Sequence, residues 1–194
     1  MKNVDQYIED FIVRSLDKID ATLQGSYNGP PIEMYIAGGV AVNYYIGSRY
    51  TMDVDAVYSH RILLDFESLV QTSEDGTLLY FDSNYNDSFS LMHENYQEDA
   101  ILWEGINNKN RLIIAKVLAP VDLAISKISR NGDQDREDIL SLAREGLFTA
   151  GELEARALEA LEYFVGNIER DRHTIELICN QIRDEIEDRY RPIL

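Results

Sequence analysis

Two aspartates, Asp53 and Asp55, lie in the apolar stretch "MDVDAVY", and two adjacent glycines, Gly38 and Gly39, precede them in the chain. Residues two apart on a strand point to the same side of a sheet, so these carboxylates would face the same way and repel each other. Two such carboxylates can hold one or two Mg²⁺ ions, which would cancel the repulsion. A glycine pair before a helix brings backbone N–H groups and the positive helix N-terminus to phosphate oxygens. The residues therefore indicate a site for a phosphate and a divalent metal.

Each of these features also has a purely structural explanation. Gly38 and Gly39 could do no more than turn a strand tightly into a helix. The two aspartates could lie on an edge strand whose polar face is in water. It is their combination in one strand–glycine–helix–strand unit that favours chemistry.

A second set of polar residues lies in the stretch "DLAISKISRNGDQDREDI". Lys127 falls on an expected amphipathic helix, where a lysine is ordinarily solvated. Asp135 and Asp138 are three residues apart and therefore share a helix face. Taken alone, they are acids that the helix dipole favours near an N-terminus.

The stretch "AGGVAVNYYIGSRYTMDVDAV" resembles the signature of the nucleotidyltransferase superfamily with the DNA polymerase β fold. That signature is a Gly-Gly or Gly-Ser turn, a short helix, and Asp-x-Asp on the next strand. The form "RYTMDVD" is similar to that of bacterial nucleotidyltransferases related to abortive-infection toxins. The second block of that group has a helical lysine, a basic residue and an acidic pair, which Lys127, Arg130, Asp135 and Asp138 match. The resemblance covers roughly residues 33–145 and is closest to an uncharacterised bacterial branch, in which blocks similar to "NDSF" and "PVDL" recur.

This resemblance implies a magnesium-dependent reaction, with two Mg²⁺ ions expected. An acceptor would attack the α-phosphate of an NTP in line, and pyrophosphate would leave. Asp53 and Asp55 would be catalytic metal ligands, and Gly38 and Gly39 would bind the β- and γ-phosphates. Lys127 would offer its charge to the triphosphate.

The remaining matched residues have less specific roles. Arg130, Arg49 and Thr51 are expected to bind the nucleotide, although Arg49 could instead pair with an acid and Thr51 could simply suit a strand. Asp135 or Asp138 would be a third metal ligand or would orient Lys127. We assign Asp135 to the metal and Asp138 to catalysis, an order that the sequence does not decide. Three nearby tyrosines could stack on a base, but core packing is the more frequent role of such residues: Tyr44, Tyr45 and Tyr50.

Hydrophobic periodicity predicts the elements that must position these residues. Helices are expected over 4–24, 40–47 and 61–71, strands over 33–39, 52–58, 77–81 and 111–118, and a turn over 73–76. After Pro120 the pattern is helical, over 121–130, 134–146, 153–165 and 172–190. Asp133 is expected to cap one of these helices, and Thr149 with Glu152 to form a capping box.

This order predicts an α+β protein with a small mixed β-sheet nucleotidyltransferase core, flanking helices and a helical C-terminal third. The expected segments are an N-terminal helix packed on the core (1–30), the core itself (31–146) and a C-terminal helical segment (147–194).

The net charge of −17 repels nucleic-acid phosphates, so a long RNA or DNA partner is disfavoured. Much of this charge is explained by a solvated acidic surface. No apolar stretch reaches the ~18 residues that span a bilayer, and the N-terminus lacks the apolar core of a signal peptide. The single cysteine, Cys179, is expected to be a small buried hydrophobic residue. A cytoplasmic location is the simplest expectation.

Two functions are compatible with the sequence. The first is an NMP transferase whose acceptor is a protein, a tRNA end or a small molecule; the resemblance implies a toxin–antitoxin or phage-defence setting, with a cognate toxin or antitoxin as partner. The acidic balance favours a protein or small-molecule acceptor. The second is a catalytically silent module that binds a nucleotide or a partner.

Overall fold

The computed structural model describes residues 5–72, 76–108 and 110–187. The chain divides into two compact units, which we call unit 1 (residues 1–86 and 100–118) and unit 2 (residues 87–99 and 119–194). Unit 1 combines helices with mixed sheets and unit 2 is helical, so the predicted α+β class with a helical C-terminal third is confirmed. The division into segments 1–30, 31–146 and 147–194 that the sequence suggests remains a prediction.

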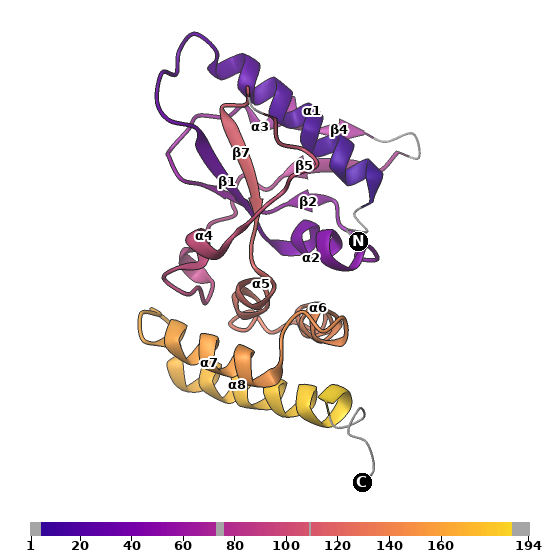
Figure 1. The fold of residues 1–194 in the computed structure, drawn as a ribbon, viewed down its shortest axis with the longest axis vertical. Coiled ribbons are helices and arrows are strands. Elements are labelled where there is room, and N and C mark those ends of the chain that lie inside the picture. Colours follow the sequence, from indigo (N-terminus) through magenta and orange to yellow (C-terminus); the bar gives the residue numbers. More distant parts are fainter. Residues whose placement is uncertain (1–4, 73–75, 109, 188–194) are drawn as a thin grey trace. The chain divides into compact units, whose positions relative to one another are not determined.

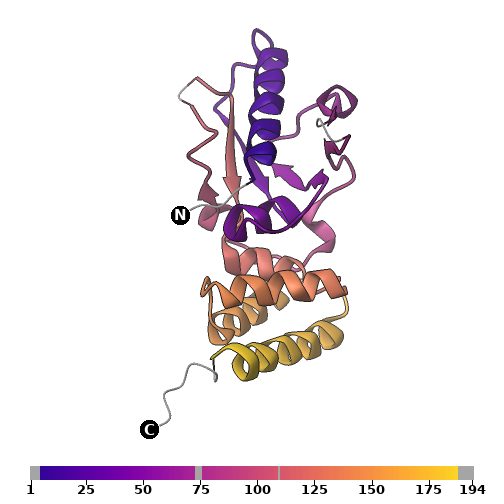
Figure 2. The same cartoon turned by 90° about the vertical axis from the view of Figure 1, so that its right-hand side faces the viewer.

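Helix α1 (Gln6–Leu23) opens unit 1 and confirms the expected N-terminal helix. The Asp5 side chain caps it by accepting a hydrogen bond from Tyr7 N at 2.9 Å. Apolar residues at helical spacing are buried along one side: Ile8, Phe11, Ile12, Leu16 and Ile19. This side lies along a face of the larger sheet (Figures 1 and 2).

The larger sheet has four strands in the order β3–β1–β7–β6. These are β1 (Ile32–Ile36), β3 (Ala56–Tyr58), β6 (Ile101–Leu102) and β7 (Ile113–Val117). β1 runs parallel to β7 and antiparallel to β3, and β6 runs antiparallel to β7, so the sheet is mixed.

A smaller sheet has the order β2–β5–β4, with β2 (Asp53–Val54), β5 (Leu78–Phe81) and β4 (Gln71–Thr72). β2 runs parallel to β5, and β4 runs antiparallel to it. The strand expected over 52–58 is therefore divided at Asp55. Its first part pairs with β5 in one sheet, and its second part pairs with β1 in the other.

The helix expected over 61–71 is wrong. Only α3 (Phe66–Leu69) forms there, and Leu69 is its buried residue. Leu63 is 89% exposed and, of the apolar residues of this stretch, only Leu69 is buried, so too little apolar surface is covered to stabilise a longer helix. Residues 73–75 of the expected turn lie outside the described residues.

Unit 2 is helical, as expected. The segment 87–99 contributes the short helices η1 (Asp87–Phe89) and α4 (Tyr96–Asp99). The rest forms α5 (Pro120–Ser126), α6 (Asp133–Arg144), α7 (Ala150–Leu161), α8 (Ile168–Ile182) and the π-helical turn η2 (Arg183–Glu187). α7 and α8 lie side by side (Figures 1 and 2), and Cys179 of α8 is buried as expected.

The helix ends test the predicted caps. Thr149 and Glu152 form the expected capping box at the start of α7. The prediction that Asp133 caps α6 is wrong, because Gly132 occupies the N-cap position and Asp133 is the first helical residue. The Asp135 carboxylate, three residues into the helix, accepts the Gly132 N–H at 3.1 Å. Within the described part of the chain, no helix is both long and apolar enough to cross a membrane.

Candidate active site

A glycine turn connects β1 to helix α2 (Gly38–Ile46) in unit 1. Gly38 has φ +58°, in the left-handed region that favours glycine. A Cβ on Gly38 would lie 1.8 Å from Asp55 Oδ2, and a Cβ on Gly39 would lie 2.6 Å from Thr51 Oγ1. The segment 51–55 approaches the turn this closely because neither glycine has a side chain.

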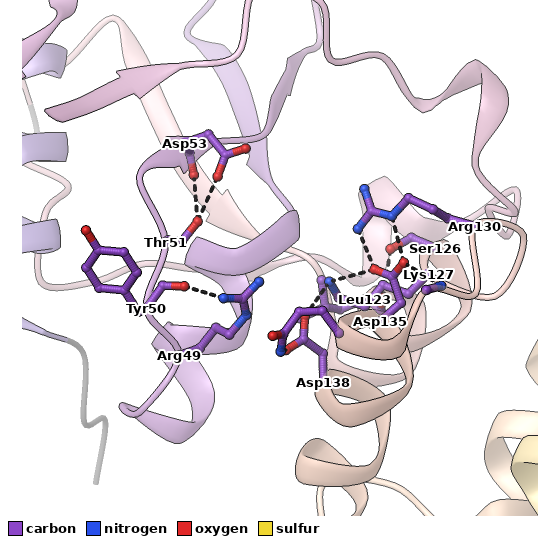
Figure 3. Close-up of polar contacts among 12 residues, drawn as sticks. Arg49, Tyr50, Thr51, Asp53, Leu123, Ser126, Lys127, Arg130, Asp135 and Asp138 are labelled. Atoms are coloured by element: carbon purple, nitrogen blue, oxygen red, sulfur yellow. Dashed lines mark hydrogen bonds and ion pairs between the residues drawn. The ribbon is translucent and has the colours of Figure 1, made fainter.

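The two aspartates lie beside this turn. Val54 between them is fully buried, so the alternation of the strand places both half-buried carboxylates on the opposite side. Thr51 Oγ1 donates a hydrogen bond to Asp53 Oδ1 at 2.8 Å, which fixes that carboxylate (Figure 3). The Ala37 N–H donates to the Asp55 carbonyl at 2.9 Å and ties the acidic segment to the end of β1.

The start of α2 suits an anion. Among the described residues, no side chain caps this helix through a hydrogen bond, and its nine residues give it a dipole whose positive end lies at Gly38. Phosphate oxygens are ordinary partners for such a helix start, especially after glycines.

The paired carboxylates also suit Mg²⁺, although the chain does not enclose the ion. In the described ranges, no group of three or more His, Cys, Asp and Glu side chains could hold a metal ion. Mg²⁺ is commonly bound by one or two carboxylates together with the phosphates of a substrate. A site with Asp53 and Asp55 beside a phosphate-binding turn meets that requirement.

Asp82 is a carboxylate that the sequence analysis missed. It follows β5 where Asp55 follows β2, and its N–H donates to the Val54 carbonyl at 3.0 Å. Because β2 and β5 are parallel, Asp55 and Asp82 leave the sheet at the same edge. The Asp82 carboxylate accepts the Asn84 N–H at 2.8 Å. The sequence shows that Asp82 follows "TLLYF", but it does not show the parallel pairing of β2 with β5 that brings Asp82 close to Asp55.

Lys127, at the end of α5 in unit 2, is buried rather than solvated, with 3% exposure. Its Nζ lies 2.9 Å from Asp138 Oδ2 and 3.8 Å from Asp135 Oδ1. Gln134 Nε2 donates to the other Asp138 oxygen at 3.0 Å. Lys127 and Asp138 therefore form a buried ion pair that links α5 to α6 (Figure 3).

Arg130 has the opposite exposure. Its side chain is 68% exposed, yet Nε donates to Asp135 Oδ2 at 2.8 Å and a second guanidinium nitrogen pairs with Oδ1 (Figure 3). Burial alone would raise the pKa of Asp135. The hydrogen bond and charge of Arg130, with smaller contributions from Lys127 and the Gly132 N–H, instead hold that pKa below its ordinary value.

The residues that precede Asp53 and Asp55 in the chain differ from one another in burial and contacts. Arg49 is half-buried and donates to the Tyr50 carbonyl. Tyr44 is buried with its ring 4.8 Å from that of Trp103, which confirms core packing for this tyrosine. Tyr50 is 64% exposed. Arg49, Tyr50 and Thr51 line one side of a cleft of about 570 Å³ whose other side includes residues of α1.

The candidate residues thus form one cluster in each unit. In unit 1 the structure brings together Gly38, Gly39, Thr51, Asp53 and Asp55. In unit 2 it brings together Lys127, Arg130, Asp135 and Asp138.

A comparison with known protein families gives one match that covers most of the chain. The family model described as "Nucleotidyltransferase of unknown function (DUF6036)" matches residues 14–191. No curated protein and no solved structure matches the chain. The matched residues include both clusters.

Proposed function

The chain belongs to this family of nucleotidyltransferases, and from that membership we propose that it moves the NMP group of an NTP to an acceptor with Mg²⁺ at Asp53 and Asp55. The observation that carries the proposal is the contact between Gly38 and Asp55, where a Cβ would lie 1.8 Å from the carboxylate. The turn that we propose for phosphate and the carboxylate that we propose for the metal therefore lie next to each other. A protein that binds only a partner has no need of this arrangement.

Each residue of unit 1 has a role in this proposal. Asp53 and Asp55 hold Mg²⁺, while Gly38 and Gly39 turn their backbone N–H groups toward the phosphates. Thr51 keeps the Asp53 carboxylate in one orientation through its 2.8 Å hydrogen bond. When bound, Mg²⁺ neutralises phosphate charge and lowers the pKa of the attacking hydroxyl.

In unit 2, the different exposures of Lys127 and Arg130 support different roles for these two cations. Arg130 is the exposed cation, and the buried Asp135 carboxylate supports it through two hydrogen bonds. We assign phosphate contact to Arg130 because its planar fork binds phosphates well. Lys127 and Asp138 are positioning residues that hold α5 against α6. Asp135 is occupied by Arg130, so we assign the metal to Asp53 and Asp55 alone.

The net charge of −17 supports a protein or small-molecule acceptor over a long nucleic acid. A toxin–antitoxin or phage-defence setting is supported only by the resemblance of the motif "RYTMDVD".

The test is transfer of label from an α-labelled NTP, with Mg²⁺ and a cell extract, to any acceptor. We expect Asp53→Asn/Asp55→Asn to reduce transfer at least about a hundredfold, since metal binding contributes several kcal/mol to such reactions. Asp65→Asn/Glu67→Gln is the matched control, because it removes the same charge from an exposed part of unit 1. Full transfer by the Asp53/Asp55 variant would contradict the proposal. Nucleotide binding by the wild type without any transfer would support a silent module instead.

A further inference from the structure

Tyr80 lies directly beside Asp53. β2 and β5 are parallel, and their register pairs Asp53 with Tyr80 and Val54 with Phe81. Neighbouring strands are about 5 Å apart, so the two side chains stand next to each other on the same sheet face.

The exposures of the β5 side chains show that this sheet face is the solvent-exposed one. Leu79 and Phe81 are 1% and 3% exposed and belong to the core, whereas Leu78 and Tyr80 are 48% and 38% exposed. An aliphatic side chain and an aromatic ring therefore remain open to solvent on the face that carries Asp53. We call Leu78 and Tyr80 the β5 platform.

The platform and the glycine turn lie on opposite sides of the acidic segment. The Val54 carbonyl accepts the Asp82 N–H on the β5 side, and the next carbonyl, of Asp55, accepts the Ala37 N–H on the β1 side. In an in-line displacement the attacking and leaving oxygens are on opposite sides of the phosphorus. If pyrophosphate leaves at the glycine turn, the acceptor enters over β5.

We propose that the β5 platform binds the acceptor and selects a hydroxyl carried by an uncharged, aromatic or apolar frame. This inference rests on the proposed function. The hydroxyl oxygen forms a bond to the α-phosphorus, the bond from that phosphorus to the bridging oxygen of pyrophosphate breaks, and the hydroxyl proton is released to solvent. The products are a phosphodiester and pyrophosphate.

The surroundings of the platform argue for an acceptor without phosphate groups. Acids stand next to it, at Asp53 and Asp82, and β2, β4 and β5 contain no lysine or arginine. A nucleic-acid acceptor depends largely on cationic contacts to its phosphates, which these strands do not offer. An aromatic or apolar frame can instead pack on Tyr80 and Leu78.

The experiment compares acceptor probes in wild type, Tyr80→Thr and Leu78→Thr, since threonine is favoured in strands. The probes are N-acetyltyrosinamide, a short uncharged peptide that contains tyrosine, and an oligoribonucleotide with a free 3′ end. We expect each variant to raise the KM for the two uncharged probes about three- to tenfold, the scale of an aromatic contact. The KM for the NTP should not change, and Tyr80→Phe should behave as wild type. Preference for the free amide or for the peptide separates a small-molecule acceptor from a protein.

Tyr163→Thr is the control, because Tyr163 is an exposed tyrosine of unit 2 at 63%. An unchanged acceptor KM in both platform variants would overturn the inference, and so would more efficient labelling of the oligoribonucleotide. Saturation-transfer NMR measures binding of N-acetyltyrosinamide to the protein without NTP. This readout tests the platform even if no transfer occurs, so failure of the platform is distinguished from failure of the proposed function. Equal probe binding by wild type and by a folded Tyr80→Thr protein would also overturn it.

Discussion

Gly38 combines two constraints that seldom occur at one residue. Its φ of +58° is strained for any other residue, and its missing Cβ leaves room for Asp55 Oδ2, which a Cβ would meet at 1.8 Å. Gly25 shares only the first constraint, because it has φ +85° and no atom within 4 Å of its would-be Cβ. A comparison of substitutions at Gly38 and Gly25 therefore separates the effect of backbone strain from the effect of the contact with Asp55.

We therefore predict that Gly38→Ala and Gly25→Ala both lower the free energy of unfolding, each by at least about 1 kcal/mol, through their positive φ. Only Gly38→Ala should also lose label transfer, by about a hundredfold, because displacement of a catalytic group by about 1 Å has that effect. Denaturant unfolding and the transfer assay measure the two quantities. Transfer at the wild-type rate by Gly38→Ala would show that the glycine turn is not part of the site.

The chemical types of the site residues could be predicted from the sequence, but their surroundings could not. The combination of the acids and glycines indicated one site, and in the structure Asp55 lies beside Gly38 while Asp53 is bonded to Thr51, beside Gly39. The same reasoning gave no means to see that Lys127 is buried while Arg130, three residues later, is exposed. Burial depends on which helix packs over a residue, and periodicity within one helix does not contain that information.

At the scale of elements, long periodic segments were predicted well and strand partners were not. The helix α1 and the strands β1, β5 and β7 lie where the pattern indicates. The division of residues 52–58 between two sheets depends on the pairing of β2 with β5, which lies more than twenty residues later in the chain. The same pairing brings Asp82, the residue after β5, next to the end of β2. The helix expected over 61–71 is shortened to α3 for a related reason, since only Leu69 of its expected apolar face is buried.

In helix α6, Asp135 takes part both in the cap at the helix start and in the cluster of charged residues of unit 2. Asp135 accepts the Gly132 N–H at the helix start and also binds Arg130. Its lowered folded-state pKa means that this stabilisation is complete above the ordinary aspartate value of about 3.9 and is lost as the pH falls through the lower folded-state value.

Asp135→Asn should therefore lower the free energy of unfolding by about 1–2 kcal/mol at pH 7, the scale of a lost helix cap. The difference from wild type should shrink as the pH falls below about 4, because wild type loses the carboxylate charge there. Asp133→Asn, in the same helical turn but exposed, should change stability little at any pH. Denaturant unfolding from pH 3 to 7 measures this, and a difference that is independent of pH would contradict the argument.

At the scale of the whole molecule, the chain enters unit 2 twice. The segment 87–99 interrupts unit 1, and residues 119 onward form the rest of unit 2. An ion pair and a hydrogen bond hold the interrupting segment in place. Arg156 of α7 pairs with Asp99 at 2.6 Å and also with Asp122 of α5 at 2.9 Å. His93 Nε2 and Glu159 Oε2 are 3.2 Å apart, within hydrogen-bond distance. The polar composition of residues 83–100 does not indicate these contacts, because the partners of Asp99 and His93 lie far along the chain, on α7.

The net charge of −17 also acts on the whole molecule, and it determines the sign of a salt effect. An NTP with Mg²⁺ remains anionic, so the field of the protein opposes its approach. Salt screens that field, with a Debye length of about 10 Å at 0.1 M. We predict that the KM for the NTP falls about two- to threefold as KCl rises from about 50 to about 300 mM at saturating Mg²⁺.

As a control, sucrose at matched osmolarity should not change this KM. A site governed by exposed cations would show the reverse, because salt weakens attraction as well as repulsion. A KM that rises with KCl would therefore contradict the prediction, because it would mean that cations near the bound NTP outweigh the acidic surface.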